Sequence, residues 1–147
     1  MARSRSRDIR RAMLAALKAA APLTTLVPGA QIHPQTVPAN PAWPFICMGA
    51  PSAVTRIKGA CIDGAESIVA IHGFSKGRYS GKRLIETAED HAGRIGDAIA
   101  ASLDSRRLAL EGGGEVKIDW TGDQLLQDPE EAGAFHVVSN FRMRHLS

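Results

Sequence analysis

The sequence is poor in cysteine and in aromatic residues, and it has no long hydrophobic run. Only two cysteines, Cys47 and Cys61, occur in 147 residues, which excludes a disulfide scaffold and favours a reduced, cytosolic compartment. Aromatic residues make up 5%, so the predicted core consists mainly of Ile, Leu, Val and Ala. No apolar run approaches the roughly 18–20 residues of a membrane-spanning helix. This length, with 44% hydrophobic residues, predicts a single soluble domain.

The positive charge is concentrated at the N-terminus. The net charge is +3, but residues 1–11 hold five arginines against one acidic residue, Asp8, and the rest of the chain is slightly acidic. A nucleic-acid-binding domain normally carries a basic face within its fold, so this distribution disfavours that class. We predict a basic arm at residues 1–8 and one domain at 9–147. The arm is either a solvated terminus or a segment that binds an acidic protein surface, with DNA phosphates as a weaker alternative.

Hydrophobic periodicity predicts two helices, the first from residue 4 or 6 to residue 20 and the second over residues 81–103. A short extra turn is expected at 23–27. Five prolines between Pro28 and Pro44 exclude a regular helix from that stretch. The predicted strands cover a brief edge at 32–33, followed by 45–48, 66–74, 116–127 and 135–144, and residues 107–110 are either a short strand or a turn.

These elements predict an α+β fold. We expect a single domain with a mostly antiparallel four- to five-stranded sheet, and with the long helix and the N-terminal helix packed on one face. Residues 51–65 are predicted to be a connection, either a long hairpin or an excursion away from the sheet, and residues 75–80 are predicted to be a polar loop. The strand at 66–74 is apolar on both sides, which indicates a central strand or a face that a partner covers.

The segment Gly73–Arg83 superficially resembles a phosphate-binding loop. Such a loop requires G-x-x-x-x-G-K-[ST], but here Arg83 follows Gly81-Lys82, and Lys76 occupies the position of the first glycine. We therefore predict a basic loop in which Ser80 caps the following helix.

No catalytic or metal-binding constellation is apparent. No two of the five histidines have the helical H-x-x-x-H spacing of a metal site, and the two cysteines lack a second close pair. A folded cluster of Cys47, His72 and an acid is a weak alternative. The carboxylate pairs Glu89-Asp90 and Glu130-Glu131 are adjacent in sequence and so do not face each other across a cleft. The sequence predicts neither an enzyme nor a bound cofactor or metal.

Four segments in succession carry a resemblance to a known family. They are the alanine-rich helix at 9–20 with Pro22-Leu23-Thr24-Thr25-Leu26-Val27, the stretch ending Pro41-Ala42-Trp43-Pro44-Phe45-Ile46, the strand 66–75 that ends in an aromatic residue and a serine, and the final Phe141-Arg142-Met143-Arg144. In this order, over residues 9–146, they resemble the tail-terminator (tail-completion) family of long-tailed bacteriophages, prophages and gene transfer agents. The arm is longer and more arginine-rich than the family pattern, and the acid usual before the Leu-Val segment is missing around Ala21-Pro22.

The resemblance implies a structural, non-enzymatic virion protein. Such proteins assemble as a homohexameric ring on the tail tube, end its polymerisation and offer the surface that joins the head. The implied partners are further copies of the chain, the tail tube protein and head–tail connector proteins; DNA would at most pass through the ring, and no membrane is involved. The implied location is the head-proximal end of the virion tail, with assembly in the host cytoplasm.

Eight side chains are candidates for partner contacts, because they lie on the arm or in the predicted connections: Arg3, Arg5, Arg7, Arg56, Lys58, Lys76, Arg78 and Tyr79. A head-completion or connector protein of the head–tail interface is the main alternative function. A small DNA-binding accessory protein that uses residues 3–11 is a further one. An enzyme has no supporting residue set.

Overall fold

The computed structural model describes residues 5–146 and contains three α-helices, one short 3-10 helix and nine strands in that range. Helix α1 covers Ser6–Ala19, α2 covers Ala21–Thr24, η1 covers Gly29–Gln31 and α3 covers Ala88–Leu103. The strands are β1 (Ile32–His33), β2 (Phe45–Met48), β3 (Ser52–Lys58), β4 (Asp63–Lys76), β5 (Arg78–Ser80), β6 (Arg83–Glu86), β7 (Arg106–Ala109), β8 (Glu115–Gln127) and β9 (Ala134–Leu146). No helix in this part of the chain is long and apolar enough to cross a membrane.

The sheet is larger than the sequence predicts. Seven strands pair in the order β1-β2-β4-β9-β8-β7, with β3 also paired to β4, and β1 runs parallel to β2. The prediction of a four- to five-stranded sheet was therefore wrong, although most pairs are antiparallel. The extra strand β3 lies in 51–65, where Pro51, Gly59 and Gly64 suggested a connection. The hydrogen bond from Gly59 N to Ile62 O closes a tight turn, so the glycines end a hairpin instead of interrupting it.

The region between β4 and α3 also differs from its prediction. Residues 78–86 form a second hairpin, β5–β6, and α3 begins at Ala88 rather than at residue 81. Gly81, with a φ of 61°, provides the left-handed conformation that the tight hairpin turn requires. Ser80 does not cap the helix. The Thr87 hydroxyl accepts a hydrogen bond from Asp90 N and caps α3.

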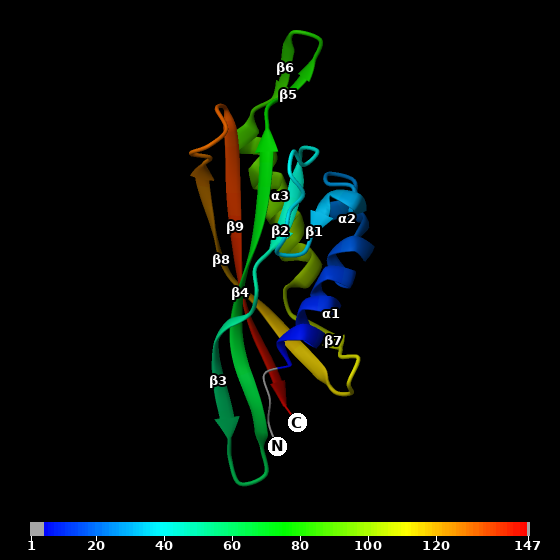
Figure 1. The fold of residues 1–147 in the computed structure, drawn as a ribbon, viewed down its shortest axis with the longest axis vertical. Helices are drawn as coiled ribbons and strands as arrows, with labels where there is room; N and C mark the ends of the chain where they lie inside the picture. Colours follow the sequence, from blue (N-terminus) through cyan, green and yellow to red (C-terminus); the bar gives the residue numbers. More distant parts are fainter. Residues whose placement is uncertain (1–4, 147) are drawn as a thin grey trace.

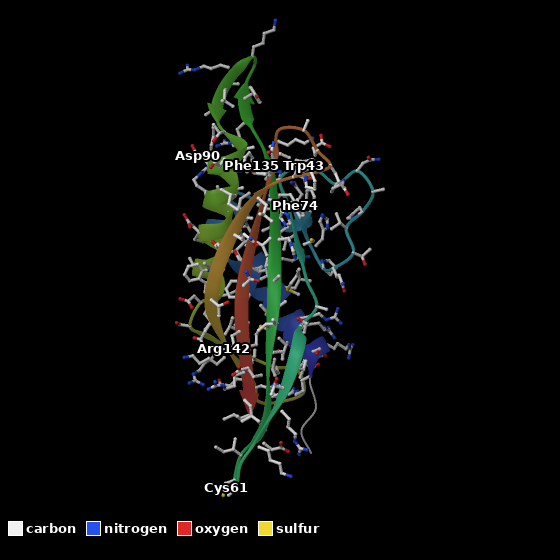
Figure 2. All side chains as sticks on the ribbon, turned by 90° about the vertical axis from the view of Figure 1, so that its left-hand side faces the viewer. Trp43, Cys61, Phe74, Asp90, Phe135 and Arg142 are labelled. Atoms are coloured by element: carbon white, nitrogen blue, oxygen red, sulfur yellow. The ribbon has the colours of Figure 1, made fainter. Side chains whose placement is uncertain are left out.

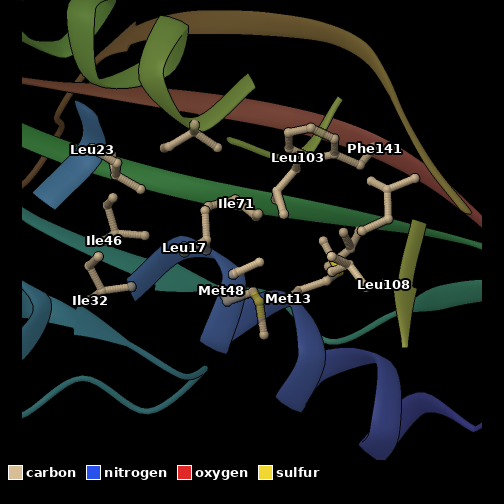
Figure 3. Packing of buried hydrophobic residues seen from close by; sticks show 14 of the residues in the cluster. Met13, Leu17, Leu23, Ile32, Ile46, Met48, Ile71, Leu103, Leu108 and Phe141 are labelled. Carbon is tan, nitrogen blue, oxygen red and sulfur yellow. The ribbon is translucent and has the colours of Figure 1, made fainter. Parts of the chain in front are cut away.

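All the helices cover one face of the sheet (Figure 1). Alternate residues of β4 and β9 face the core, where Val69 and Ile71 meet Val137 and Phe141. Helix α1 contributes one buried stripe and α3 another, and Figure 3 shows this packing. The helical residues in the core are Ile9, Met13, Ala16, Leu17, Ala92, Ile95, Ile99 and Leu103. Among residues 5–146, no helix lies on the opposite face of the sheet, and we call it the open face.

Two hairpins extend from opposite ends of the long sheet (Figure 1). At one end, β3 and the first half of β4 form the β3–β4 arm (residues 52–66), with the exposed Cys61 in its turn. At the other end lies the β5–β6 hairpin (residues 78–86). The two predicted connections are thus the two ends of the molecule.

Two glycines of α3 should respond in opposite ways to alanine. A Cβ at Gly93 would meet no atom within 4 Å, so Gly93→Ala should raise the free energy of unfolding by about 0.5–1 kcal/mol, the helix-propensity gain. A Cβ at Gly96 would lie 2.8 Å from Val137 Cγ2, so Gly96→Ala should lower that free energy despite the same gain. Urea denaturation of both variants checks this. A stabilising Gly96→Ala would contradict the close packing of α3 on β9.

Candidate partner-binding surfaces

The predicted contact residues fall into separate groups. Arg56 and Lys58 lie on the β3–β4 arm, whereas Lys76, Arg78 and Tyr79 lie at the base and first strand of the β5–β6 hairpin. The structure thus places these two groups at opposite ends of the sheet rather than on one surface (Figure 1). Their roles in partner contacts stay predictions.

The arginines of the N-terminal arm have differing surroundings. Arg3 lies outside the described residues. The Arg5 guanidinium binds Asp8 at 3.1 Å and donates to the Gly113 carbonyl oxygen, so it ties the start of α1 to the turn before β8. Arg7 is exposed and lines a hollow of about 240 Å³ together with Arg10 and Arg11. Of these residues, Arg7 offers a solvent-facing cation, while Arg5 has a structural role within the domain.

An ion-pair cluster anchors the base of the β5–β6 hairpin. The Glu86 carboxylate accepts hydrogen bonds from Arg94 of α3 at 2.6 and 2.7 Å and from Arg78 at 3.2 Å. The Arg94 bonds, more than the Arg78 bond, lower the pKa of Glu86 to about 2, against partial burial, which would raise it. Glu86 is therefore ionised at neutral pH and holds the hairpin to α3.

The β5–β6 hairpin itself exposes large apolar side chains. Tyr79 is 63% exposed, Leu84 47% and Ile85 57%. Leu84 was predicted to lie in the buried stripe of a helix, but it lies on β6 instead. Lys82 and Arg83 add two exposed cations near the turn. Apolar side chains gathered on a protruding element mark an interaction site more often than a solvated loop.

A row of aromatic and histidine rings crosses the open face. Trp43 packs edge-on against Phe45 with centroids 4.9 Å apart, Phe45 stacks on Phe74 at 4.7 Å, and Phe74 stacks on His136 at 4.2 Å. Figure 2 shows Trp43 and Phe74 side by side on this face, toward the end that carries the β5–β6 hairpin. The Lys76 ammonium lies 4.6 Å from the Trp43 ring centroid, a cation–π contact. Sequence reasoning missed this row, because its members come from three distant segments.

His72 and His136 lie at the end of this row and contact each other directly. His72 Nδ1 and His136 Nε2 are 2.7 Å apart, which requires one neutral ring to accept from the other. Burial lowers the pKa of His72; burial, and then the charge of His72, lower that of His136. The folded state therefore favours the neutral rings more strongly than the unfolded chain does.

The histidine pair predicts a dependence of stability on pH. Because the folded pKa values lie below the unfolded value of 6.5, the unfolded chain binds more protons as pH falls through this value. The free energy of unfolding should thus decrease from pH 7.5 to pH 5.5. His72→Gln/His136→Gln should flatten this slope. The pH dependence that remains should come from His91, because burial also lowers the pKa of His91. Urea midpoints at several pH values check this, with Gln124→Ala on the same face as control. An unchanged slope in the double variant would refute the assignment.

Chemistry at Cys47 and His72 has little support. The two residues are direct neighbours in the β2–β4 register, and burial raises the pKa of the Cys47 thiol, which disfavours the reactive thiolate. Within residues 5–146, no group of three His, Cys, Asp or Glu side chains could hold a metal ion. Gly73, the first residue of the loop that superficially matches a phosphate site, lies buried in β4.

Comparisons with known proteins agree with this fold. The chain matches the family described as tail completion protein gp17 over residues 11–146. A solved chain from the virion of a native gene transfer agent particle has a TM-score of 0.76 and is 20% identical, with 95% of this chain and 96% of that chain covered. A second solved structure, of a protein without a functional name, has a TM-score of 0.56 and is 14% identical, with 93% and 92% covered. No curated protein matches the sequence. The chain, matched over nearly its whole length, belongs to the tail completion protein gp17 family, and it is a structural protein of the phage tail.

Proposed function

We propose that copies of this protein form a ring that caps the phage tail tube, ends tail polymerisation and provides the surface to which the head joins. The observation that carries the proposal is the pair of hairpins at opposite ends of one elongated sheet, in a chain of the tail completion family. A subunit of this shape offers separate surfaces to the structures on its two sides. The similar chain in a gene transfer agent virion supports a place in an assembled particle.

The ring would be homohexameric and would lie at the head-proximal end of the tail, assembled in the host cytoplasm. Its partners would be the tail tube protein on one side and head–tail connector proteins on the other. Arg56 and Lys58 on the β3–β4 arm are exposed at one end and are the candidates for contacts with a neighbouring ring, and Arg56 also pairs with Asp63 across the arm at 3.1 Å. DNA would pass through the ring without sequence recognition, and the role of the protein would be structural rather than enzymatic.

Electron microscopy of particles produced without this gene tests the proposal. Tails of uncontrolled length, separate from filled heads, are the expected result. Tails of normal length beside heads that fail to join would favour a connector protein instead. Infectious particles of wild-type appearance would refute a role in virion assembly.

A variant of the β3–β4 arm tests whether its cations contact a neighbouring ring. Arg56→Ala/Lys58→Ala should reduce the yield of joined particles about tenfold or more, because two cations are removed from the end that faces the next ring. Arg107→Ala/Lys18→Ala, which removes one ion-paired arginine on β7 and one exposed lysine on α1, is the matched control. Complementation of the gene deletion gives the measurement. Equal yields for both variants would argue against a docking role of the arm.

A further inference from the structure

The β5–β6 hairpin has few contacts with its own chain. Its two strands pair with each other, and its main anchor on the body is the cluster of Glu86 with Arg78 and Arg94. Tyr79 and Leu84 are cross-strand neighbours on one side, and Ile85 follows on the other, so both sides of the hairpin expose apolar surface. Lys82 and Arg83 make its turn basic. An element of this kind requires an apolar and acidic partner surface to be buried favourably.

The same end of the molecule carries a surface with that character. β7 pairs with β8 only over Glu115–Ile118, so from Asp119 to Gln127 no strand in the described chain pairs with the outer edge of β8. Leu125 is 41% exposed and Leu126 40% along this edge. At the start of this edge the Trp120 N–H donates to Asp104 Oδ1 at 2.9 Å, and beyond it an unpaired strand edge with exposed leucines is a site for association.

The charge of this edge is opposite to that of the hairpin. The segment from Asp119 to Gly133 has no basic residue, and it holds the acidic residues Asp119, Asp123, Asp128, Glu130 and Glu131. Within the fold, Lys117 pairs with Asp119 and Lys76 with Glu131. The carboxylate of Asp128 accepts from the backbone of the following turn, which points Glu130 outward as an exposed side chain.

We propose that the β5–β6 hairpin of one copy docks on the acidic outer edge of β8, residues 119–131, of a second copy. A hollow of about 530 Å³ at the base of the hairpin, lined by Trp43, Arg78, Tyr79 and Arg94 among others, provides a concave basic surface for the acidic turn. Ile85 packs on Leu126 of the neighbour, and Lys82 and Arg83 face its carboxylates.

This contact suits ring closure. The hairpin and the acidic turn lie at the same end of the long axis (Figure 1), so a rotation about an axis along that direction brings them together without a shift along it. Two different surfaces on each copy make the contact heterologous, and a heterologous contact without axial shift closes into a ring when its rotation is a whole fraction of a full turn. The inference rests on the proposed ring, and it specifies which surfaces of neighbouring subunits meet.

Exchange of the charges tests the pairing. Lys82→Glu/Arg83→Glu in the full-length chain should raise the concentration for half-assembly about tenfold or more, since like charges then face each other. Adding Glu130→Lys should reverse most of this increase. Lys18→Glu/Arg106→Glu, which reverses two exposed cations on α1 and β7, is the matched control and should leave assembly unchanged. Native mass spectrometry and light scattering give the oligomer, and circular dichroism confirms that each variant is folded.

A mixing experiment tests the direction of the contact. Ile85→Ser removes hairpin contacts and Leu126→Ser removes edge contacts, so each variant alone should be monomeric at concentrations at which the wild type assembles. A mixture of the two has one intact hairpin and one intact edge per pair, and it should stop at heterodimers. Normal assembly of the hairpin variants, or rings from the mixture, would overturn the inference and leave the ring itself intact. A wild-type protein that never assembles, in solution or in particles, would refute the proposed function as well.

Discussion

Phe141→Ala should lower the free energy of unfolding by about 3–5 kcal/mol. Phe141 is fully buried in the middle of β9, next to Val69 and Trp120 in the sheet register, and it contributes to the core beneath the helices (Figure 3). Removing the Phe141 phenyl ring loses the free energy of its transfer from water to the core. It also leaves a cavity that the paired strands and the helices around it cannot easily close. Urea denaturation monitored by circular dichroism measures the effect.

The neighbouring residue provides the control. Arg142 points to the open face and is exposed (Figure 2), so Arg142→Ala should change the same free energy by no more than about 0.5 kcal/mol. Similar losses for the two variants would mean that the two sides of β9 are not distinguished as the structure describes.

Gly64→Ala should destabilise the protein by about 3 kcal/mol, at the upper end of the range for overpacking. A Cβ at Gly64 would overlap the backbone carbonyl oxygen of His145 on β9 and would lie 3.0 Å from the Leu146 Cα. The obstructing atoms belong to the backbone of the paired strand, so no side-chain rotation relieves the clash. Thermal and urea denaturation should both show the loss.

Gly59, at the other side of the β3–β4 arm, provides the control for Gly64. A Cβ there would meet only the Ile62 Cβ, at an ordinary 3.8 Å, so Gly59→Ala should be nearly neutral. A neutral Gly64→Ala would show that β4 and β9 do not approach each other closely at this end of the sheet.

The parts of the fold that sequence reasoning found are those with a strong local period. Helix α1 and strands β2, β8 and β9 lie within about three residues of their predicted bounds, because each carries its own alternation or stripe. The N-terminal part of the long predicted helix was wrong for a specific reason: Leu84 and Ala88 happen to be spaced four residues apart, as helix neighbours are. Thr87 and Asp90, three residues apart, were the available signal for the true start of α3.

The candidate surfaces were harder to predict. Because alternate residues of a strand share a face, the sequence indicates that positions 72 and 74 lie on one side of their strand. Only the β4–β9 register shows that His136 lies beside Phe74. The acidic edge of β8 requires the knowledge that β7 ends its pairing at Ile118. Which strand edges remain free depends on the complete sheet order, and this order is a tertiary property that no single segment encodes.

The long pairing of β4 with β9 also determines how the protein responds to mechanical load. These strands run side by side from Gly64–Leu146 to Lys76–Ala134, along the line that joins the two hairpins. Hydrogen bonds between antiparallel strands are perpendicular to the strand direction. Because β4 itself runs from one hairpin to the other, tension between the two ends of the molecule passes along its covalent backbone, and the bonds to β9 keep this strand extended. A peeling force across the sheet would instead break these bonds one at a time. A subunit built in this way resists extension along the line that joins its two hairpins.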